Sequence, residues 1–350
     1  MAIMLKESFL GTCDAAEWQR LLPSDRSVFG SHGYARICER FRGVSPRLYA
    51  LETKSGAICY PMLLRTLATL GFAIGVKAQW DAATPDYTGP ITHGDGIVLK
   101  DEFRTCREAL MIREGIVTEF VHLHPWCAHQ DLLGVGSSSD RDIVWIDLAH
   151  PPEQTYAEQF AHSCRKNIQK AVREGVTVFT ASDDWHIGEF FRIYTSTMQR
   201  NHASERYAMS LDYFKSFREE LPNNSRFVFA KVKEQIVAAT LYLHDDSDIY
   251  SFLGGADASH NECRPTNLVI WETLRWGHEQ RKLRFILGGG YSPSDGILRF
   301  KSTFSRSTQA FYTYRRIHLQ EQFNDLDTRF RNGQGIGDRH VDYFPSYRSA

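Results

Sequence analysis

The chain has 350 residues, of which 42% are hydrophobic and 24% charged, and its formal net charge at pH 7 is −1. This composition is typical of a soluble globular protein with room for two domains, and it excludes the strong overall positive charge of a dedicated nucleic-acid binder. Seven scattered cysteines without a C-x-x-C pair argue against a disulfide framework or structural zinc, and they favour reduced thiols in a cytoplasmic protein.

The first half of the chain, residues 1–150, is predicted to form an α/β domain. The expected helices are 15–22, 32–41 and 103–113, and the expected strands are 48–51, 57–64, 118–124 and 142–147. Residues 71–96 are rich in Gly, Pro, Asp and Thr and are predicted mainly as loop, with a tight turn around Tyr87. His150-Pro151-Pro152 marks the domain boundary, because two prolines end a strand and permit a helix to begin.

The second half, residues 151–320, is predicted to begin with one long helix and to continue with alternating strands and helices. In chain order we expect helix 153–174, strand 176–180, helices 185–201 and 211–221, strands 226–232, 235–244 and 249–256, helix 265–281, strand 284–287, another helix, and strand 309–314. This is the order of an N-acyltransferase domain of the GNAT type, and we interpret the first half as a degenerate copy of the same unit. Residues 321–350 are predicted to be a polar C-terminal tail.

The segment 288–304 is the most informative part of the chain. Three glycines end a short strand, and Ser294 or Asp295 is placed to cap a following helix. At about 100° per residue, one face of that helix carries four apolar side chains: Ile297, Leu298, Phe300 and Phe304. Lys301 lies in the middle of this face. Such a lysine either extends its ammonium to the rim or serves a ligand in the space that the glycines leave.

Four segments, in order, resemble signatures of the Fem family of aminoacyl-tRNA-dependent transferases, which belong to the GNAT superfamily. They are the basic helix Arg165-Lys166-Asn167-Ile168-Gln169-Lys170-Ala171 with the strand after Glu174, the hairpin 230–241, the helix that begins Pro265-Thr266-Asn267, and the glycine turn with the Phe300-Lys301 motif. Together they cover about residues 150–318. The first half matches only loosely, mainly through Tyr87-Thr88-Gly89-Pro90.

The resemblance implies an α/β fold of mixed sheets, with two tandem GNAT-like domains and a cleft between them. It also implies transfer of an amino acid from aminoacyl-tRNA to an amine acceptor, with Lys301 as the catalytic residue that stabilises charge on the reacting carbonyl. No general base is evident, and Glu272, Asp295 and His260 remain open alternatives. The chain has no segment long enough for the helical-hairpin arm of some family members, so the acceptor is either a peptidoglycan precursor or a smaller natural-product intermediate.

Further candidate residues are assigned around this predicted site. The substrate-binding candidates are Phe300, Tyr291, Asn267, Trp271, Tyr87, Arg200 and Tyr207. The tRNA-binding candidates are Arg165, Lys166, Lys170, Arg173 and Arg264, with a second basic patch at Arg275, Arg281, Lys282 and Arg284. For any single one of these cations a solvated surface side chain is the favoured interpretation, whereas the cluster as a whole fits phosphate positioning without base readout. His122 and His124 share one face of a strand, but without a completing ligand we expect no metal site.

The main alternative is N-acylation from acyl-coenzyme A, whose pyrophosphate binds a glycine-rich loop in GNAT enzymes. The corresponding loop, residues 258–265, has no glycine, contains Glu262, and ends in Pro265, which lacks an N–H group. We therefore expect aminoacyl-tRNA as co-substrate and no cofactor. A non-catalytic GNAT-like binding module is the third reading. No stretch reaches the roughly 18 apolar residues of a membrane helix, so we expect no membrane span. We also expect the protein to be a monomer.

Overall fold

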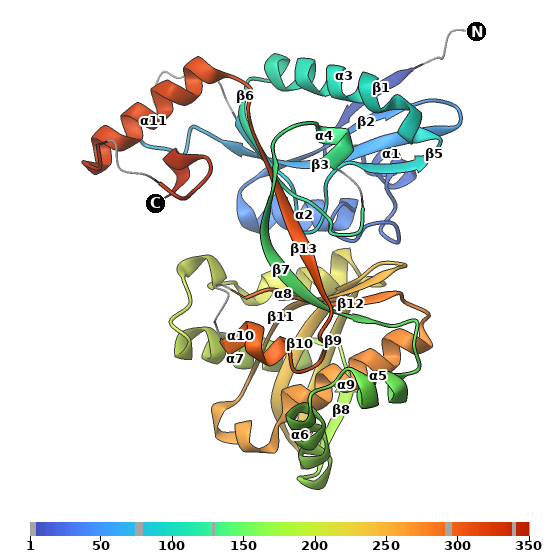
Figure 1. Cartoon of the computed structure of the whole chain (residues 1–350). Helices are drawn as coiled ribbons and strands as arrows, with labels where there is room; N and C mark the ends of the chain where they lie inside the picture. Colours follow the sequence, from blue (N-terminus) through green and yellow to red (C-terminus); the bar gives the residue numbers. More distant parts are fainter. Residues whose placement is uncertain (1–4, 74–79, 128–129, 291–295, 338–340, 350) are drawn as a thin grey trace. The chain divides into compact units, whose positions relative to one another are not determined.

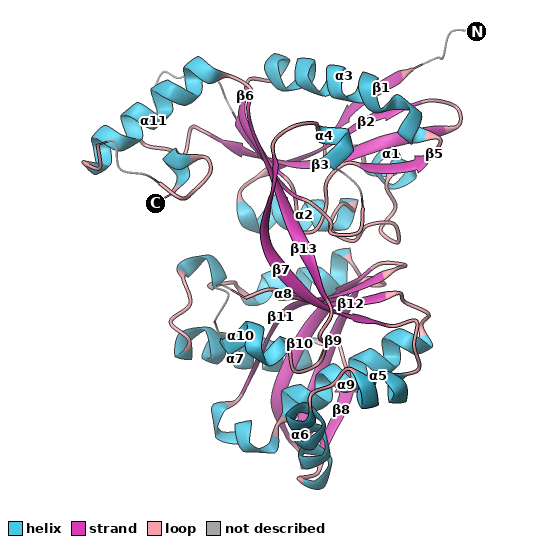
Figure 2. Cartoon of the chain, viewed as in Figure 1, coloured by secondary structure: helices cyan, strands magenta, loops and turns pink. Residues whose placement is uncertain are grey.

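The computed structural model of the chain describes residues 5–73, 80–127, 130–290, 296–337 and 341–349. The chain divides into two compact units. Unit 1 comprises Met1–Pro23, Phe29–Asp140 and Phe311–Ala350, and unit 2 comprises Ser24–Val28 and Arg141–Ala310. Both units combine helices with a mixed sheet, which confirms the predicted α/β class (Figure 1, Figure 2).

Unit 1 contains most of the elements predicted for the first half, together with the C-terminal segment. Its strands are β1 (Lys6–Leu10), β2 (Ser45–Glu52), β3 (Gly56–Thr66), β4 (Trp80–Ala83), β5 (Ile91–Gly94) and β6 (Ile116–His122), with most of β13 (Thr308–Ile317). Its helices are α1 (Ala15–Leu21), α2 (His32–Arg42), α3 (Lys100–Arg113), α4 (Gln130–Leu133) and α11 (Gln320–Gln334). The strands are ordered β1-β2-β3-β4-β6-β13, with β5 paired to β3; β4 and β6 pair in parallel, and the other neighbours named here pair antiparallel.

Helices cover both faces of the unit 1 sheet because the side chains of β2 alternate between two apolar clusters. Tyr49 and Leu51 join the cluster that contains Phe103 of α3. Leu48 and Ala50 join the cluster that contains Trp18 of α1, and this cluster also includes α2. The sheet is therefore sandwiched, with α3 on one face and α1 and α2 on the other (Figure 1).

A buried ion cluster lies inside unit 1. The carboxylate of Glu119, in β6, has no exposed surface and accepts hydrogen bonds from Arg107 Nη1 at 2.6 Å and Tyr60 Oη at 2.6 Å. His318 Nε2 lies 3.0 Å from the same carboxylate. Burial alone would raise the pKa of Glu119, but the charge of Arg107 and the hydrogen bond of His318 outweigh it and lower the pKa to about 2. The cluster ties β3, β6 and α3 to the residue that follows β13.

Unit 2 contains most of the elements predicted for the second half and also the strand predicted at 142–147, whereas the strand predicted at 309–314 lies largely in unit 1. Its strands are most of β7 (Ser137–Asp147), then β8 (Val176–Thr180), β9 (Ser225–Val232), β10 (Gln235–His244), β11 (Asp248–Ala256) and β12 (Arg284–Gly288). Its helices are α5 (Pro152–Glu158), α6 (His162–Arg173), α7 (Asp184–Arg200), α8 (Leu211–Glu220), α9 (Pro265–Glu279) and α10 (Gly296–Lys301), with 3₁₀ turns η2 (Glu205–Tyr207) and η3 (Ala258–Cys263).

The strands of unit 2 are ordered β7-β12-β11-β10-β9-β8; β11 and β12 pair in parallel, and the other neighbours in this order pair antiparallel. Alternate side chains of β9 again face different helices. Phe227 stacks edge-on against Phe190 of α7 at 5.2 Å between ring centroids. Val228 belongs to the core cluster that contains Cys164 of α6 and Leu274 of α9. Helices α7 and α8 therefore cover one face of the sheet, and α5, α6 and α9 cover the other (Figure 1).

The single long helix predicted for residues 153–174 is wrong, because the structure has two helices there, α5 and α6. The break lies where Phe160 enters the core and the amide of Ala161 donates to the carbonyl of Thr303. Arg165 Nη1 closes the break by donating to the carbonyls of Ala157 at 2.9 Å and Phe160 at 2.7 Å. The apolar spacing continues across the break, so periodicity alone does not reveal it.

Two regions predicted to lack regular structure contain it. Within the expected loop 71–96, β4 and β5 are strands, and β4 is disguised because its Asp81 is buried as an acceptor for Thr118 and Tyr347. The expected tail after residue 320 contains α11, whose Leu326 and Phe330 are buried in a cluster of unit 1. The apolar residues of α11 are few and are separated by charged and polar residues, so the sequence alone does not clearly predict a helix.

Candidate active site

Strands β11 and β12 of unit 2 run in parallel but pair over only three residues. The paired residues are Asp248 with Arg284, Ile249 with Phe285, and Tyr250 with Ile286. Beyond Tyr250, β11 continues to Ala256, and every residue from 251 to 256 is only half-buried. The other edge of this stretch is bonded to β10. Within the described ladders, no strand pairs with residues 251–256 on the β12 side, so this edge of the sheet is where an extended ligand could add.

The glycine turn after β12 is held by two cations. Gly288 has a left-handed φ of 82°, which favours glycine. Lys301 Nζ donates to the carbonyl of Gly289 at 2.7 Å, and Arg141 Nη1 donates to the carbonyl of Gly290 at 3.1 Å. A Cβ on Gly289 would lie 3.1 Å from Arg141 Cδ, so a larger residue would disturb this arrangement. The predicted neighbourhood of Lys301 and the glycine turn is thus present in the structure.

The apolar face predicted around Lys301 is only partly correct. Phe300 packs against the core of unit 2 and Phe304 is fully buried, with their rings 5.3 Å apart. Ile297, predicted on the same face, is 42% exposed. Helix α10 spans only Gly296–Lys301, and Phe304 lies in tight turns beyond its end, where its amide donates to the carbonyl of Lys301, so Phe304 and Ile297 do not share one helical face. A spacing of 100° per residue does not apply across such turns.

The free end of β11 is fixed by α7. Thr197 Oγ1 accepts from the amide of Ala256 at 3.2 Å, and Arg200 Nη2 donates to the carbonyl of Ala256 at 3.2 Å. This close packing requires Gly255, because a Cβ there would lie 2.3 Å from Thr197 Oγ1. Arg200, a predicted substrate-binding residue, is therefore already bound to the strand that opens from β12.

The loop between β11 and α9 satisfies many of its own amides. Asp257 Oδ1 accepts from the amide of Ser259 at 3.0 Å, and the amide of His260 donates to the carbonyl of Asp257. The hydrogen bonds of Ser259 lower the pKa of Asp257. Further along, the amide of Arg264 donates to the carbonyl of Asn261 at 3.1 Å. These N–H groups already donate within the loop, so they do not indicate a phosphate-binding site.

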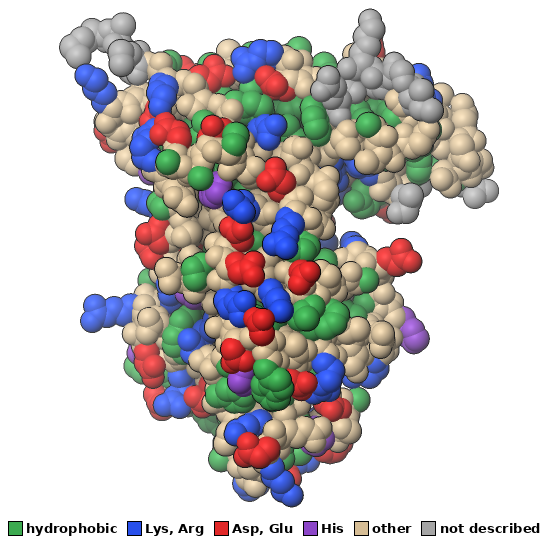
Figure 3. Space-filling view, turned by 180° about the vertical axis from the view of Figure 1, so that it is seen from behind, with side chains coloured by type: hydrophobic (Ala, Val, Ile, Leu, Met, Phe, Trp, Pro, Cys, Tyr) green, Lys and Arg blue, Asp and Glu red, His purple; other side chains and the backbone are tan. Residues whose placement is uncertain are grey.

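The predicted tRNA-binding residues of unit 2 lie on α6 and at the start of α9. Lys166 and Arg173 are exposed, whereas Arg165 donates a hydrogen bond to the carbonyl of Phe160 at the break between α5 and α6. Lys170 Nζ forms an ion pair with Glu262 at 3.4 Å, which joins α6 to the loop before α9. Arg264 caps α9 with a φ of 55°, and its Nε is buried without a hydrogen-bond partner among the described residues. On the face drawn in Figure 3, basic and acidic side chains are interspersed.

Several predicted substrate-binding residues have structural contacts. Asn267 is only 4% exposed, and its Nδ2 lies 3.8 Å from Cys164 Sγ, which connects α9 to α6. The ring of Trp271 lies 5.1 Å from the ring of Tyr156. Tyr207 accepts a hydrogen bond from Tyr194 through its carbonyl at 2.9 Å. Tyr291 lies outside the described residues.

The remaining predicted residues are distributed over both units. In unit 1, Tyr87 has a φ of 44°, and its ring contacts those of Phe29 and Phe311. Of the open alternatives for a general base, Glu272 forms an ion pair with Arg275 at 3.1 Å, and His260 Nδ1 lies 2.9 Å from Ser259 Oγ. Asp295 lies outside the described residues.

The sequence interpretation missed Arg141 and Thr197. Arg141 lies in β7 within Asp140-Arg141-Asp142, a run of charges without any distinguishing pattern. Thr197 was detectable indirectly, because Gly254-Gly255 inside a predicted strand indicates close approach of another element.

The described part of the chain has neither a candidate metal centre nor a candidate membrane-spanning helix. No group of three or more His, Cys, Asp and Glu side chains is placed there to hold a metal ion. None of the described helices combines the length and the apolar character that crossing a bilayer requires.

Comparisons with known proteins place this geometry in context. Residues 158–302 match the family model described as an acetyltransferase (GNAT) domain. The crystal structure of FemX covers 91% of this chain and 99% of its own, with a TM-score of 0.69 and 11% identity. No curated protein sequence matches the chain.

Two further solved structures are similar to the chain. The C-terminal domain of a putative lysylphosphatidylglycerol synthetase from Agrobacterium fabrum has a TM-score of 0.52 and 11% identity, over 81% of this chain and 88% of that one. L-PGS from Bacillus licheniformis has a TM-score of 0.50 and 12% identity, over 81% and 90%. At such identities the similarity concerns the fold. It confirms the predicted resemblance: the chain has the fold of FemX, and its residues 158–302 match the family model of a GNAT acetyltransferase domain.

Proposed function

We propose that this chain is an aminoacyltransferase that moves an amino acid from aminoacyl-tRNA to an amine and forms an amide bond. The observation that carries the proposal is the half-buried ammonium of Lys301, held 2.7 Å from the carbonyl of Gly289 in the turn that follows β12. The open edge of β11 beside β12 supports it, because it supplies backbone groups to orient an acyl donor.

The chemistry requires few groups because an aminoacyl ester is already activated. The acceptor nitrogen attacks the ester carbonyl carbon, a C–N bond forms, and the carbonyl oxygen becomes an oxyanion. The oxyanion then collapses, the C–O bond to the terminal ribose of the tRNA breaks, and the proton lost by the amine is passed to the ribose oxygen. Lys301 has three N–H donors and gives one to Gly289, and in the proposed mechanism its positive charge stabilises the oxyanion in a half-buried site.

The loop before α9 supports tRNA rather than coenzyme A as the donor. A pyrophosphate needs several free amides at this helix N-terminus. Here Pro265 has none, and the amides of Ser259, His260 and Arg264 are bonded within the loop. The guanidinium of Arg264 and the exposed cations of α6 are suited to single backbone phosphates of an acceptor stem, a contact that positions the RNA without reading its sequence.

Replacement of Lys301 tests the mechanism. We expect Lys301→Ala to lower kcat by roughly 10²–10³, the usual cost of removing an oxyanion donor, while Lys301→Arg retains part of the activity. Arg299→Ala is the matched control, because Arg299 is an exposed cation on the same helix without an assigned role. Circular dichroism of each variant checks folding. Turnover by Lys301→Ala equal to that of the control would exclude the proposed role.

A donor assay separates the two enzyme classes. The purified chain is incubated with tRNA charged with labelled amino acids, or with labelled acetyl-coenzyme A, and with a panel of amino acids and amino sugars as acceptors. We expect label to reach an amine only from aminoacyl-tRNA, and ribonuclease to abolish the transfer. Ribonuclease-resistant transfer from acetyl-coenzyme A would instead identify an acyl-coenzyme A N-acyltransferase.

A further inference from the structure

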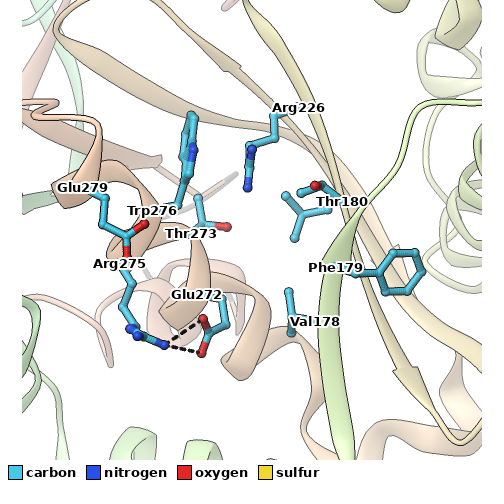
Figure 4. Close-up of a pocket in the computed structure, with 10 residues that line it drawn as sticks. Val178, Phe179, Thr180, Arg226, Glu272, Thr273, Arg275, Trp276 and Glu279 are labelled. Carbon is cyan, nitrogen blue, oxygen red and sulfur yellow. Dashed lines mark hydrogen bonds and ion pairs between the residues drawn. The ribbon is translucent and has the colours of Figure 1, made fainter.

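Unit 2 contains a cavity of about 280 Å³ whose lining does not include Lys301 or the glycine turn. It lies between β8, β9 and the C-terminal half of α9 (Figure 4). Its charged lining residues are two arginines and two glutamates, so the formal charges cancel. Charges of both signs around a neutral cavity suit a ligand that itself carries one charge of each sign.

Arg226 forms the cationic end of this cavity. Its guanidinium lies over the ring of Trp276, 4.2 Å from the centroid, and Figure 4 shows it directed into the cavity. Its Nε is buried without a hydrogen-bond partner, and no described residue forms an ion pair with the guanidinium. Burial lowers the pKa of Arg226, and the charge of Glu279, which lines the same cavity without forming an ion pair with Arg226, offsets this only in part. A planar guanidinium fixed by a ring and without a carboxylate in direct contact is suited to bind one.

The opposite end of the cavity offers acceptors. The hydroxyl of Thr273 donates to the carbonyl of Val269 at 2.8 Å, so towards the cavity its oxygen can only accept. The carboxylate of Glu272 lies beyond it and is paired with exposed Arg275 at 3.1 Å. Figure 4 shows the hydroxyl of Thr273 between Arg226 and Glu272. The oxygens of Thr273 and Glu272 suit an ammonium group, which would share the carboxylate of Glu272 with Arg275.

The wall between the two ends is apolar. Val178 and Val228 both line the cavity, and the hydroxyl of Thr180 lies at its mouth. Figure 4 shows the ring of Phe179 turned away from the cavity, as expected for the alternate side of β8. The alternation leaves two β-branched side chains as the contact surface for a small aliphatic group.

We propose that this cavity is a binding site for a free α-amino acid with a small aliphatic side chain. The carboxylate pairs with Arg226 and accepts from Thr180. The ammonium donates to Thr273 and Glu272, and the side chain contacts Val178 and Val228. A phosphate group is disfavoured because Glu272 and Glu279 add negative charge to the same cavity. This assignment does not depend on the transferase activity proposed for Lys301.

Calorimetric titration of the full chain in the absence of RNA tests the assignment, with L-alanine, acetate, methylamine and inorganic phosphate as probes. We expect saturable binding of L-alanine, with acetate and methylamine each at least tenfold weaker because each lacks one charged end. No saturable heat with L-alanine would overturn the proposal. Phosphate binding more tightly than L-alanine would also overturn it and would indicate a nucleic-acid or nucleotide phosphate instead.

Variants assign the two ends. Arg226→Gln should weaken binding of L-alanine at least tenfold, and Glu272→Gln should weaken L-alanine while leaving acetate unchanged. Arg306→Gln is the control for loss of one positive charge, because Arg306 is exposed and outside the cavity. Thermal unfolding checks that each variant folds. If Arg226→Gln does not fold, Thr180→Val must weaken L-alanine instead, and unchanged binding by the folded variants refutes the assignment.

Discussion

Removing the cation from the buried cluster of unit 1 should have a large effect on stability. Arg107→Met leaves the carboxylate of Glu119 with no exposed surface and without its ion-pair partner 2.6 Å away. Breaking one half of a buried pair costs about 3–5 kcal/mol. The pKa of Glu119 agrees in direction, since burial would raise it but the charge of Arg107, together with His318 and Tyr60, lowers it.

The effect is measured by hydrogen exchange of the β6 amides, which reports opening of unit 1 without assuming that the whole chain unfolds in one step. The matched control is Arg316→Met in the same unit, which removes an ion pair between Arg316 and Glu108 whose side chains are 45% and 48% exposed. That change should cost less than about 1 kcal/mol. A loss for Arg107→Met no greater than for the control would refute the electrostatic reasoning.

The same cluster predicts a pH dependence. Because folding lowers the pKa of Glu119, its contribution is fully present above the unfolded value of about 4.5 and is lost as the pH falls towards about 2. Glu119→Gln should remove this part of the acid sensitivity of the β6 amides. An unchanged slope between these pH values would show that other carboxylates dominate.

Two further predictions concern unit 2. Gly255→Ala places a Cβ 2.3 Å from Thr197 Oγ1 and should lower the free energy of unfolding, measured with urea, by about 1–3 kcal/mol. The control Gly188→Ala, in open space on α7, should raise it by up to about 1 kcal/mol. Equal effects of the two changes would contradict the packing of α7 on β11. Burial and two neighbouring cations lower the pKa of His244 to about 4, so its neutral form is favoured in the fold and stability is lost as the pH falls from about 6.5 to 4. His244→Gln should flatten the thermal-unfolding midpoint over that range, and an unaltered pH profile would count against this.

The parts of the fold that follow from local pattern were predictable from the sequence. The three strands β9, β10 and β11 are mainly apolar runs joined by short polar turns, one of them with Lys233 at a φ of 53°. Helix α7 begins after Asp183, whose side chain accepts from the amides of Trp185 and His186. Such signals lie within a few residues of the structure they specify.

The features that sequence reasoning missed depend on partners far along the chain. The break between α5 and α6 depends on Arg165 and on a carbonyl at Thr303. Strand β4 contains Asp81, whose carboxylate oxygens accept hydrogen bonds from residues as far along the chain as Arg348. At the candidate site, the proximity of Lys301 to Gly289 follows from one short motif, while the second cation, Arg141, comes from 148 residues before Gly289 in the chain.

The division of unit 1 along the chain has a consequence for how the protein is made. Strand β13 pairs with β6 from Thr313 to Ile317, and Tyr347 and Arg348 bond Asp81, yet all of these partners are synthesised after the whole of unit 2. Unit 2 has its own sheet and core from residues 141–310 and is ready to fold first on the ribosome. The N-terminal polypeptide must therefore wait, with an unfinished sheet edge, until translation of the last segment supplies its closing strand and its counter-ion.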